Sequence, residues 1–333
     1  MIDCERLEYI TKTRVLYEGS ERTTELHHRR EPLFGLYWSI LSPERAQRAG
    51  IPKPGTLEES KHEKCYFELK NIHQTPEPRF YHETIRVNEY VPVTVPNLFT
   101  YSLCGTVNCF TSHDKYNPML LDAPDFYNYL HITQHNARLL TQSGHTRMFS
   151  HINVGPLAGG TQQHPHSQDG VLEEHILTTN DQELSVYSTL AQKDRDPFVM
   201  HEDFVREHQL LGYENKDAYA AGAYAPQYPD QIDIYPKERI SKMTDLDPGS
   251  MRSLSEVMAQ SVLFLTQTRG VTQFNMIAHS DRLNSNERGY RLHFHLYPRN
   301  KNVFGGLEVG HNVYVVDVFG ETTAKLLRAF SKH

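Results

Sequence analysis

The chain has 333 residues, enough for one large or two medium domains, and a formal net charge of −7 from 34 Lys and Arg against 41 Asp and Glu. No basic run stands out and no run reaches roughly 18 apolar residues, so we expect neither a nucleic-acid partner nor a membrane span. The N-terminus lacks the apolar core of a signal peptide, which predicts a soluble, cytoplasmic protein.

Cysteine and histidine usage narrows the chemistry. The four cysteines, Cys4, Cys65, Cys104 and Cys109, are too few and too scattered for a disulfide framework in a chain of this length. The 20 histidines are the outlying count, and several of them recur at the spacing of ligands. The sequence therefore indicates histidine chemistry rather than disulfides.

The first recurring unit lies in the N-terminal half of the chain. Asp122, before Ala-Pro, precedes a helical pattern that ends at Gly144, and a strand is expected from about residue 147 to 153. A glycine-containing loop then leads into a second strand, which carries His164 and His166. This order predicts a helix followed by two antiparallel strands.

The second unit repeats this order further along the chain. Asp247, before Pro, precedes a helical pattern that ends at Gly270, and a strand is expected from about residue 272 to 277. A longer polar loop then leads to His293 and His295. The agreement predicts an internal duplication.

The duplication sets the expected fold. Each half is expected to have the order strand, helix, strand, loop, strand, which predicts an α+β protein with one extended antiparallel sheet and helices packed on it. We predict an N-terminal half over residues 1–186 and a C-terminal half over residues 187–333. Residues 187–235 are expected to bridge the halves with a charged helix and a Tyr/Ala/Pro-rich piece, and residues 321–330 to form a terminal helix.

The stretch from Asn153 to Gln168 combines three features that phosphoryl chemistry needs. The Gly-Gly pair at 159–160 lets the backbone approach a ligand and predicts N–H groups exposed to anionic oxygens. His164 and His166 face one side of a strand, and Gln168 continues that face with an amide that can donate to a phosphate oxygen. A histidine held in this way can attack phosphorus and carry the transferred group.

Several separated motifs carry a family resemblance. They are, in chain order, residues 30–35 with 42–48, residues 96–99, residues 153–168, and residues 291–299 with 306–308. Together they resemble the galactose-1-phosphate uridylyltransferases of the histidine-triad superfamily, over about residues 29–330. The resemblance implies two tandem histidine-triad-like halves and a homodimer.

The resemblance also implies a reaction. His166 would attack the α-phosphorus of a nucleotide sugar and form a nucleotidyl-histidine, with UMP as the expected nucleotide, and a sugar 1-phosphate would then accept it. His164 and Gln168 would complete the catalytic set. The first half is expected to be the reactive one because the second half has Tyr297 where the first has Gln168, and because it lacks the Gly-Gly pair.

Substrate contacts follow from the same resemblance. The implied residues are Arg45, Arg48, Asn97, Phe99, Asn153, Gly159, Gly160, Thr161 and Glu308. Arg45 and Arg48, three residues apart, could fork onto phosphate oxygens, although a solvated turn is the alternative. Phe99 could equally be an ordinary core residue.

Two metal sites are implied. The family often carries a structural zinc on a Cys-x-x-Cys pair, a later His and the first His of His-Pro-His. Here a His-x-x-Cys replaces the pair, which predicts a zinc set of His62, Cys65, His113 and His164. The alternative is a degenerate site in which Cys65 is a small buried apolar residue.

A second metal, structural in the family and either iron or zinc, is predicted on Glu183, His279, His293 and His295. Glu173 and Glu174 are rival carboxylates. The alternative to a metal here is a cluster of hydrogen-bonded histidines.

The sugar end departs from the family. The strict hexose enzymes have a Tyr before the Glu that aligns with Glu308 and a Gln six residues after it, where this chain has Leu307 and Tyr314. Loss of an amide that binds a hydroxyl weakens discrimination for that hydroxyl. The sequence therefore leaves open an ADP-sugar or dinucleoside polyphosphate phosphorylase or hydrolase. Two further alternatives are a silent nucleotide-binding protein, which the presence of both His166 and Gln168 disfavours, and a metal-storage or sensor protein, which leaves the Gly-Gly pair and the arginine pair unexplained.

Overall fold

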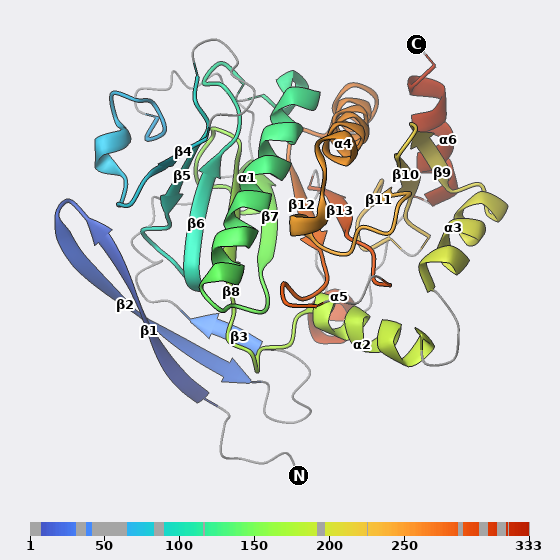
Figure 1. The fold of residues 1–333 in the computed structure, drawn as a ribbon. Helices are drawn as coiled ribbons and strands as arrows, with labels where there is room; N and C mark the ends of the chain where they lie inside the picture. Colours follow the sequence, from blue (N-terminus) through green and yellow to red (C-terminus); the bar gives the residue numbers. More distant parts are fainter. Residues whose placement is uncertain are drawn as a thin grey trace.

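A large antiparallel sheet forms the body of the molecule (Figure 1). The computed structural model describes residues 8–30, 38–41, 65–82, 90–115, 117–191, 197–224, 226–285, 289–299, 306–311, 318 and 320–332. The ten strands of the sheet are, in spatial order, β4 (Phe80–Tyr81), β5 (Val93–Pro96), β6 (Leu103–Cys109), β8 (His166–Val171), β7 (Phe149–Val154), β12 (Phe274–His279), β13 (His293–Pro298), β11 (Ile232–Pro236), β10 (Ala218–Gly222) and β9 (Leu211–Glu214).

The strand order reads the same outward from both sides of the β7–β12 pair. On one side, β7 pairs with β8, and β6, β5 and β4 follow outward. On the other side, β12 pairs with β13, and β11, β10 and β9 follow outward. One long helix precedes the inner strand in each half, α1 (Ala123–Gln142) before β7 and α4 (Pro248–Arg269) before β12. The predicted fold class, two tandem halves that share one antiparallel sheet, is therefore confirmed.

The two long helices begin where the sequence predicts, because each has its own capping residue. The Asp122 side chain accepts from the N–H of Asp125 in a capping box, and Asp247 accepts from the N–H groups of Gly249 and Ser250. Gly270 closes α4 at a φ of 64°, a left-handed conformation that glycine adopts without strain. α1 and α4 lie side by side on one face of the sheet (Figure 1).

Alternation along the strands separates the core from the opposite face. In β7, Ser150, Ile152 and Val154 are buried beneath the helices, while His151 and Asn153 point to the other side and are half-buried. The apolar cluster between sheet and helices includes Ile152, Met276, Leu296, Phe294, Phe126, Leu130, Val257 and Val262. The face away from α1 and α4 therefore carries His151 and Asn153, whereas Ser150 lies on the helix-facing side.

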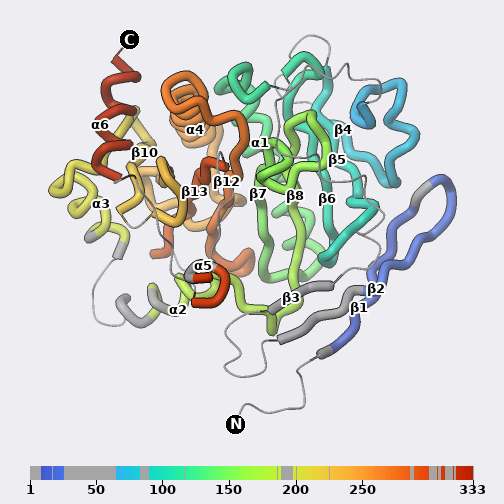
Figure 2. Tube along the Cα trace, turned by 180° about the vertical axis from the view of Figure 1, so that it is seen from behind, coloured from blue at the N-terminus to red at the C-terminus, as the bar shows by residue number. Residues whose placement is uncertain are grey.

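The remaining helices lie around the edges of the sheet. They are α2 (Thr179–Ala191), α3 (Pro197–Glu207), α5 (Gly306–His311) and α6 (Gly320–Phe330). In both views α2 and α5 appear at the same end of β12 and β13 (Figure 2). α6 confirms the predicted terminal helix. No helix among the described residues is long and apolar enough to cross a membrane.

A second, three-stranded sheet is formed by β1 (Glu8–Tyr17), β2 (Ser20–Arg30) and β3 (Trp38–Leu41). It lies beside the N-terminal half of the main sheet (Figure 1).

The expectation that residues 187–235 bridge the halves is wrong for their second part. After α2 and α3, this segment supplies β9, β10 and most of β11, the counterparts of β4, β5 and β6. All five residues of β10 are buried, and a Cβ on Gly222 would lie 2.1 Å from the carbonyl oxygen of Gly320. The small residues therefore make room for the chain at the start of α6. The predicted boundary between residues 186 and 187 falls inside α2.

Candidate active site and metal centres

The sheet register brings the predicted catalytic residues onto one face. His166 lies opposite Asn153 on β7, and Gln168 lies opposite His151. Because side chains alternate along a strand, His166 and Gln168 point to the face away from α1 and α4, while Ser167 and Asp169 point toward the helices. The structure thus places His166 and Gln168 on one face, as the sequence predicts, and Asn153 lies on the same face.

His166 is held in one orientation by its own strand. Its Nδ1 lies 2.9 Å from the carbonyl oxygen of His164, and the side chain is 2% exposed. A carbonyl can only accept, so Nδ1 carries the hydrogen and donates it. The lone pair of a neutral imidazole is then on Nε2, the nitrogen that would act as a nucleophile.

Gln168 is also oriented by a neighbour. The hydroxyl of Tyr101 donates to its Oε1 over 2.8 Å, and the same hydroxyl lies 3.3 Å from Nε2 of His151. With Oε1 accepting, the NH₂ end of the amide is left to donate to a ligand. The Tyr101 ring stacks on Phe149, with centroids 6.0 Å apart.

The glycine loop forms a tight turn rather than a cradle of exposed N–H groups. The N–H of Gly159 donates to Pro156 and that of Gly160 donates to Gly155, each over 3.0 Å. The expectation that these two N–H groups face an anion is therefore wrong, because the loop itself uses them. The glycines are needed for shape: Gly159 has a φ of 79°, and a Cβ on Gly160 would lie 3.0 Å from the carbonyl oxygen of Asn153.

The predicted nucleoside contacts, Asn97 and Phe99, lie toward the C-terminal end of β8, whereas His166 lies at its N-terminal end. Asn97 donates its N–H to Gly105, four residues along β6 from Cys109, which faces His166. Four residues of strand span about 13 Å. The Asn97 side chain accepts from the N–H of Phe99, and the Arg22 guanidinium lies 5.5 Å from the Phe99 ring centroid.

The other predicted substrate contacts are placed only in part. Thr161 follows the glycine loop and is half-buried, and Glu308 lies in α5. Arg45, Arg48 and His62 lie outside the described residues. The substrate-binding set thus stays a prediction.

Three of the four predicted ligands of the first metal site come together. Nδ1 of His164 lies 3.4 Å from Sγ of Cys65 and 3.3 Å from Nδ1 of His113. On its other side, Nε2 of His164 lies 3.1 Å from the carbonyl oxygen of Thr111, which directs Nδ1 toward the cluster. One thiol and two imidazoles suit zinc. Cys109, with Sγ 3.3 Å from Nε2 of His164, is a neighbour that we did not predict.

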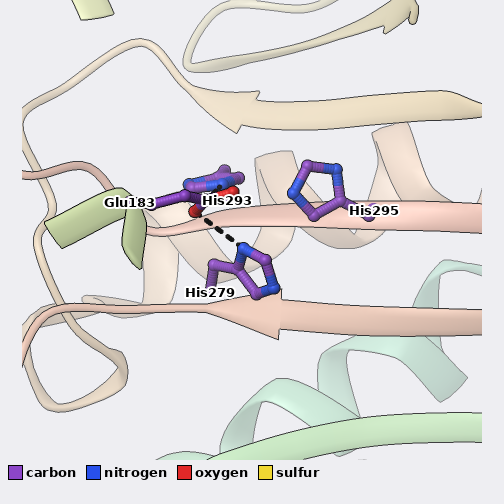
Figure 3. Close-up of side chains that lie close together, drawn as sticks. All are labelled: Glu183, His279, His293 and His295. Carbon is purple, nitrogen blue, oxygen red and sulfur yellow. Dashed lines mark hydrogen bonds and ion pairs between the residues drawn. The ribbon is translucent and has the colours of Figure 1, made fainter. Parts of the chain in front are cut away.

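All four predicted ligands of the second site converge (Figure 3). Glu183 comes from α2, His279 from β12, and His293 and His295 from β13. The Glu183 carboxylate lies 2.8 Å from Nδ1 of His279 and 3.4 Å from Nε2 of His293. The four donor atoms lie within 4.8 Å of one another, so this N₃O set could hold iron or zinc. Of the carboxylates considered, Glu183 is the one in this cluster.

Partners outside the second cluster fix its ring orientations. Nδ1 of His293 donates to the carbonyl oxygen of Arg291 over 2.9 Å, and Nδ1 of His295 donates to Asp233 over 2.8 Å. Both rings therefore present Nε2 to the cluster, as second-layer hydrogen bonds do in metal sites. Burial lowers the pKa of His279 to about 4, so this ring is neutral near pH 7, as a metal ligand must be.

Glu183 in the second cluster and Asp233 beside it are both held in the charged form. Burial works to raise the pKa of Glu183, but hydrogen bonds with His279 and His293 outweigh it and lower the pKa. Burial likewise opposes ionisation of Asp233, and the nearby His295 outweighs it and lowers that pKa.

The register corrects our comparison of the two halves. Asn275 pairs with Asn153 across the centre of the sheet, and its partner on β13 is Tyr297, as the partner of Asn153 on β8 is His166. Tyr297 therefore corresponds to His166, not to Gln168. Two residues before each of these, His295 in β13 corresponds to His164, which precedes β8, and both belong to metal clusters.

Tyr101, His151 and Asp233 are site residues that the sequence analysis missed. Asp233 is a polar residue between Ile232 and Ile234 on a buried strand, and this interruption is a usable signal. Tyr101 and His151 carry no such signal, because they meet Gln168 only through strand pairing.

Comparison with known proteins supports the fold. No family profile and no curated protein sequence matches the chain. A uridylyltransferase structure is 18% identical, with 92% of this chain and 98% of that chain covered and a TM-score of 0.69. An ADP-glucose phosphorylase from Arabidopsis thaliana, with bound ADP-glucose, has the same identity and coverage and a TM-score of 0.70.

A GalT-like protein from Arabidopsis thaliana is 17% identical, with 80% and 92% covered and a TM-score of 0.70. The resemblance to the GalT-like proteins is thus confirmed at the level of the fold. The chain has the fold that these uridylyltransferase, GalT-like and ADP-glucose phosphorylase structures share.

Proposed function

We propose that the protein is a nucleotidyltransferase that moves a nucleoside monophosphate, with UMP expected, from a nucleotide sugar to a sugar 1-phosphate. The single observation that carries this proposal is the geometry of His166. Its Nδ1–H is committed to the His164 carbonyl, and its side chain shares a face with Gln168 and Asn153. A metal-storage or sensor role would need neither this geometry nor the oriented Gln168 amide.

The reaction follows from the tautomer. The Nε2 lone pair of His166 attacks the α-phosphorus, the bond to the bridging oxygen breaks, and the sugar 1-phosphate leaves with that electron pair. The nitrogen that attacks carries no proton, and the positive charge on the ring is stabilised by the His164 carbonyl at Nδ1–H. A phosphate oxygen of the second substrate then attacks the same phosphorus and frees the imidazole.

The neighbouring groups position this chemistry. The NH₂ group of Gln168 donates to a non-bridging oxygen as negative charge develops on it. Metal ions at the two centres, when bound, would cross-link strands as structural sites do. Cys65, His113 and His164 would hold the first, with His62 as the predicted fourth ligand, and Glu183, His279, His293 and His295 would hold the second.

A second candidate is a phosphorylase that uses inorganic phosphate as the acceptor. The ADP-glucose phosphorylase matches the fold at a TM-score of 0.70, level with the uridylyltransferase at 0.69. Both reactions need the same nucleotidyl-histidine and differ in the group that discharges it. The homodimer and the base remain predictions for either reaction.

The covalent intermediate gives the decisive experiment. The protein is incubated separately with UDP-glucose, ADP-glucose and a dinucleoside polyphosphate, and intact mass is measured. We expect one base-stable, acid-labile nucleoside monophosphate per chain from one of these donors. Discharge by a hexose 1-phosphate supports the transferase, and discharge by inorganic phosphate alone supports the phosphorylase.

Two variants locate the adduct. His166→Asn should form none, while His135→Asn, a change on α1 away from this face, should form the wild-type amount. An adduct that persists in His166→Asn, or the absence of an adduct with every donor, would contradict the proposal.

A further inference from the structure

A cavity of about 460 Å³ lies over β7, β12 and β13, on the same face of the sheet as the candidate active site. Its walls include Asn275, Tyr297 and Arg299 from the C-terminal half, together with Phe149 and residues near the start of α2. The volume falls within the range of about 300–1,000 Å³ that is typical of small-molecule sites.

The sheet register makes this cavity the counterpart of the candidate active site. Asn275 faces Tyr297 across a strand pair in the same way that Asn153 faces His166. The next residue on that face is Arg299, whose N–H donates to Gln273, and its counterpart is Gln168. The cavity is therefore lined by the residues that replace the reactive set in the second half.

The tyrosine that orients the amide also has a counterpart. Tyr101, from the β5–β6 connection, bonds to Gln168, and Tyr228, from the β10–β11 connection, accepts a hydrogen bond from Arg299. The Arg299 guanidinium lies 4.7 Å from the Tyr228 ring centroid. The duplication has therefore kept the layout of a ligand site and changed its side chains.

The changed side chains suit a nucleotide. Tyr228 and Tyr297, with ring centroids 5.5 Å apart, offer aromatic surface for a base. Three arginines, Arg147, Arg282 and Arg299, line the cavity against two aspartates, Asp181 and Asp281, which leaves positive charge for a phosphate. The Arg282 side chain is 41% exposed and forms ion pairs with Glu174 and Asp181. We propose that this cavity binds a second nucleoside phosphate, which is held without reaction.

The absence of reaction follows from Tyr297. A phenol has no basic ring nitrogen and is protonated near neutral pH, so it cannot replace the imidazole that attacks phosphorus. A nucleotide bound here would not exchange its phosphoryl group. The site is thus a binding site that both halves line, built around Tyr297 of the C-terminal half, and its existence does not depend on the transfer reaction proposed for His166.

Equilibrium dialysis with radiolabelled UMP and, separately, AMP tests this proposal. His166→Asn is the background, so no covalent adduct contributes to the count. We expect two nucleotides per chain, falling to one when Arg282→Glu is added, with at least a tenfold weaker affinity at the lost site. Arg282→Lys keeps the charge and should retain both nucleotides.

The outcomes separate this site from the first. If a single nucleotide binds and Arg282→Glu releases it, the cavity is supported although the first site fails. If one nucleotide binds and is unaffected by Arg282→Glu, or if none binds, the proposal is overturned. In the chain with His166 intact, Arg282→Glu should leave the adduct measured by intact mass unchanged.

Discussion

Tyr101 donates its hydroxyl hydrogen to Oε1 of Gln168 over 2.8 Å, although the two residues are 67 positions apart in the chain. The bond fixes which end of the amide faces a ligand. Without it, the amide can rotate and present its oxygen to a phosphate, and two acceptors then repel each other.

Tyr101→Phe should therefore slow formation of the nucleotidyl-histidine roughly tenfold, the equivalent of one hydrogen bond of about 1.4 kcal/mol. The ring and its stacking on Phe149 are kept, so the midpoint of urea unfolding should change little. Adduct formation is followed by rapid quench and intact mass. A wild-type rate would show that Gln168 needs no help from Tyr101.

Asn275 couples the two halves at the centre of the sheet. Its Nδ2 donates to Oδ1 of Asn153 over 2.6 Å and to the carbonyl oxygen of Ala158 over 2.9 Å. Asn275→Asp places a charged acceptor against both oxygens, so the free energy of unfolding should fall by about 2–3 kcal/mol and the adduct should form more slowly. Urea unfolding and intact mass measure the two effects.

Asn215→Asp is the matched control for Asn275→Asp. It also removes an amide that donates twice, to Ser253 and Glu256, but lies far from the glycine loop in sequence and in the sheet. Asn215→Asp should lower the free energy of unfolding without slowing formation of the adduct. Equal slowing in both variants would mean that general loosening, rather than the Asn153 contact, is responsible.

The glycine loop predicts different costs at neighbouring positions. Gly159 and Gly144 both have positive φ, 79° and 83°, with open space at Cβ, so alanine at either should cost about 1–2 kcal/mol of stability. At Gly160, alanine would press on the carbonyl oxygens of Asn153 and Gly155, each 3.0 Å away. Gly160→Ala should thus slow adduct formation, while Gly144→Ala should not.

His82 should make stability depend on pH in the acid range. Its Nε2 lies 2.8 Å from Oγ1 of Thr94, and burial, with the nearby His135 and His131, lowers the pKa from the usual 6.5 to about 4. Between these values the unfolded chain binds the proton and the folded chain does not, so stability falls as pH drops from 6.5 to 4. The contribution of His82 to the free energy of unfolding that is lost in this way amounts to about 3 kcal/mol.

His82→Gln should remove the pH-dependent part of the stability that is due to His82. Urea unfolding of both proteins at pH 7.5 and pH 4.5 gives the comparison, and the loss on acidification should be smaller in the variant by about 2–3 kcal/mol. Parallel losses in the two proteins would show that other groups dominate the acid response.

The second metal centre should be sensitive to Asp233. Asp233→Asn keeps an acceptor for Nδ1 of His295 but removes the charge that strengthens the ring as a ligand. We expect at least tenfold weaker zinc binding at one of two sites, measured by competition with a chromophoric chelator. Cys65→Ser should weaken the other site, so the two variants together distinguish the centres.

Features governed by local rules were predictable from the sequence. The Asp-Ala-Pro start of α1 and the Asp-Pro start of α4 carry their own capping bonds, so the helix starts follow from a few adjacent residues. His293 and His295 had to share a strand face because side chains alternate. Glu183, in contrast, was chosen from the family resemblance, and its place beside His279, His293 and His295 depends on the tertiary fold.

Features set by strand pairing were not predictable. The Ala-rich β10 is buried on both faces and shows no alternation, so it did not resemble a strand. The correspondence of Tyr297 with His166 depends on the register of β13 against β12. This register is not evident in the sequence because the loop before β13 differs in length from the loop before β8. The prediction of exposed N–H groups at Gly159 and Gly160 was wrong because the Gly-Gly pair alone does not specify the type of turn.

Glu183 belongs to the helix that follows the first repeat, yet it joins three histidines of the second. The second repeat therefore has no carboxylate of its own in this cluster, and α2 supplies it. A chimera that takes its second repeat from a related protein would keep the metal centre only if α2 were transferred with that repeat.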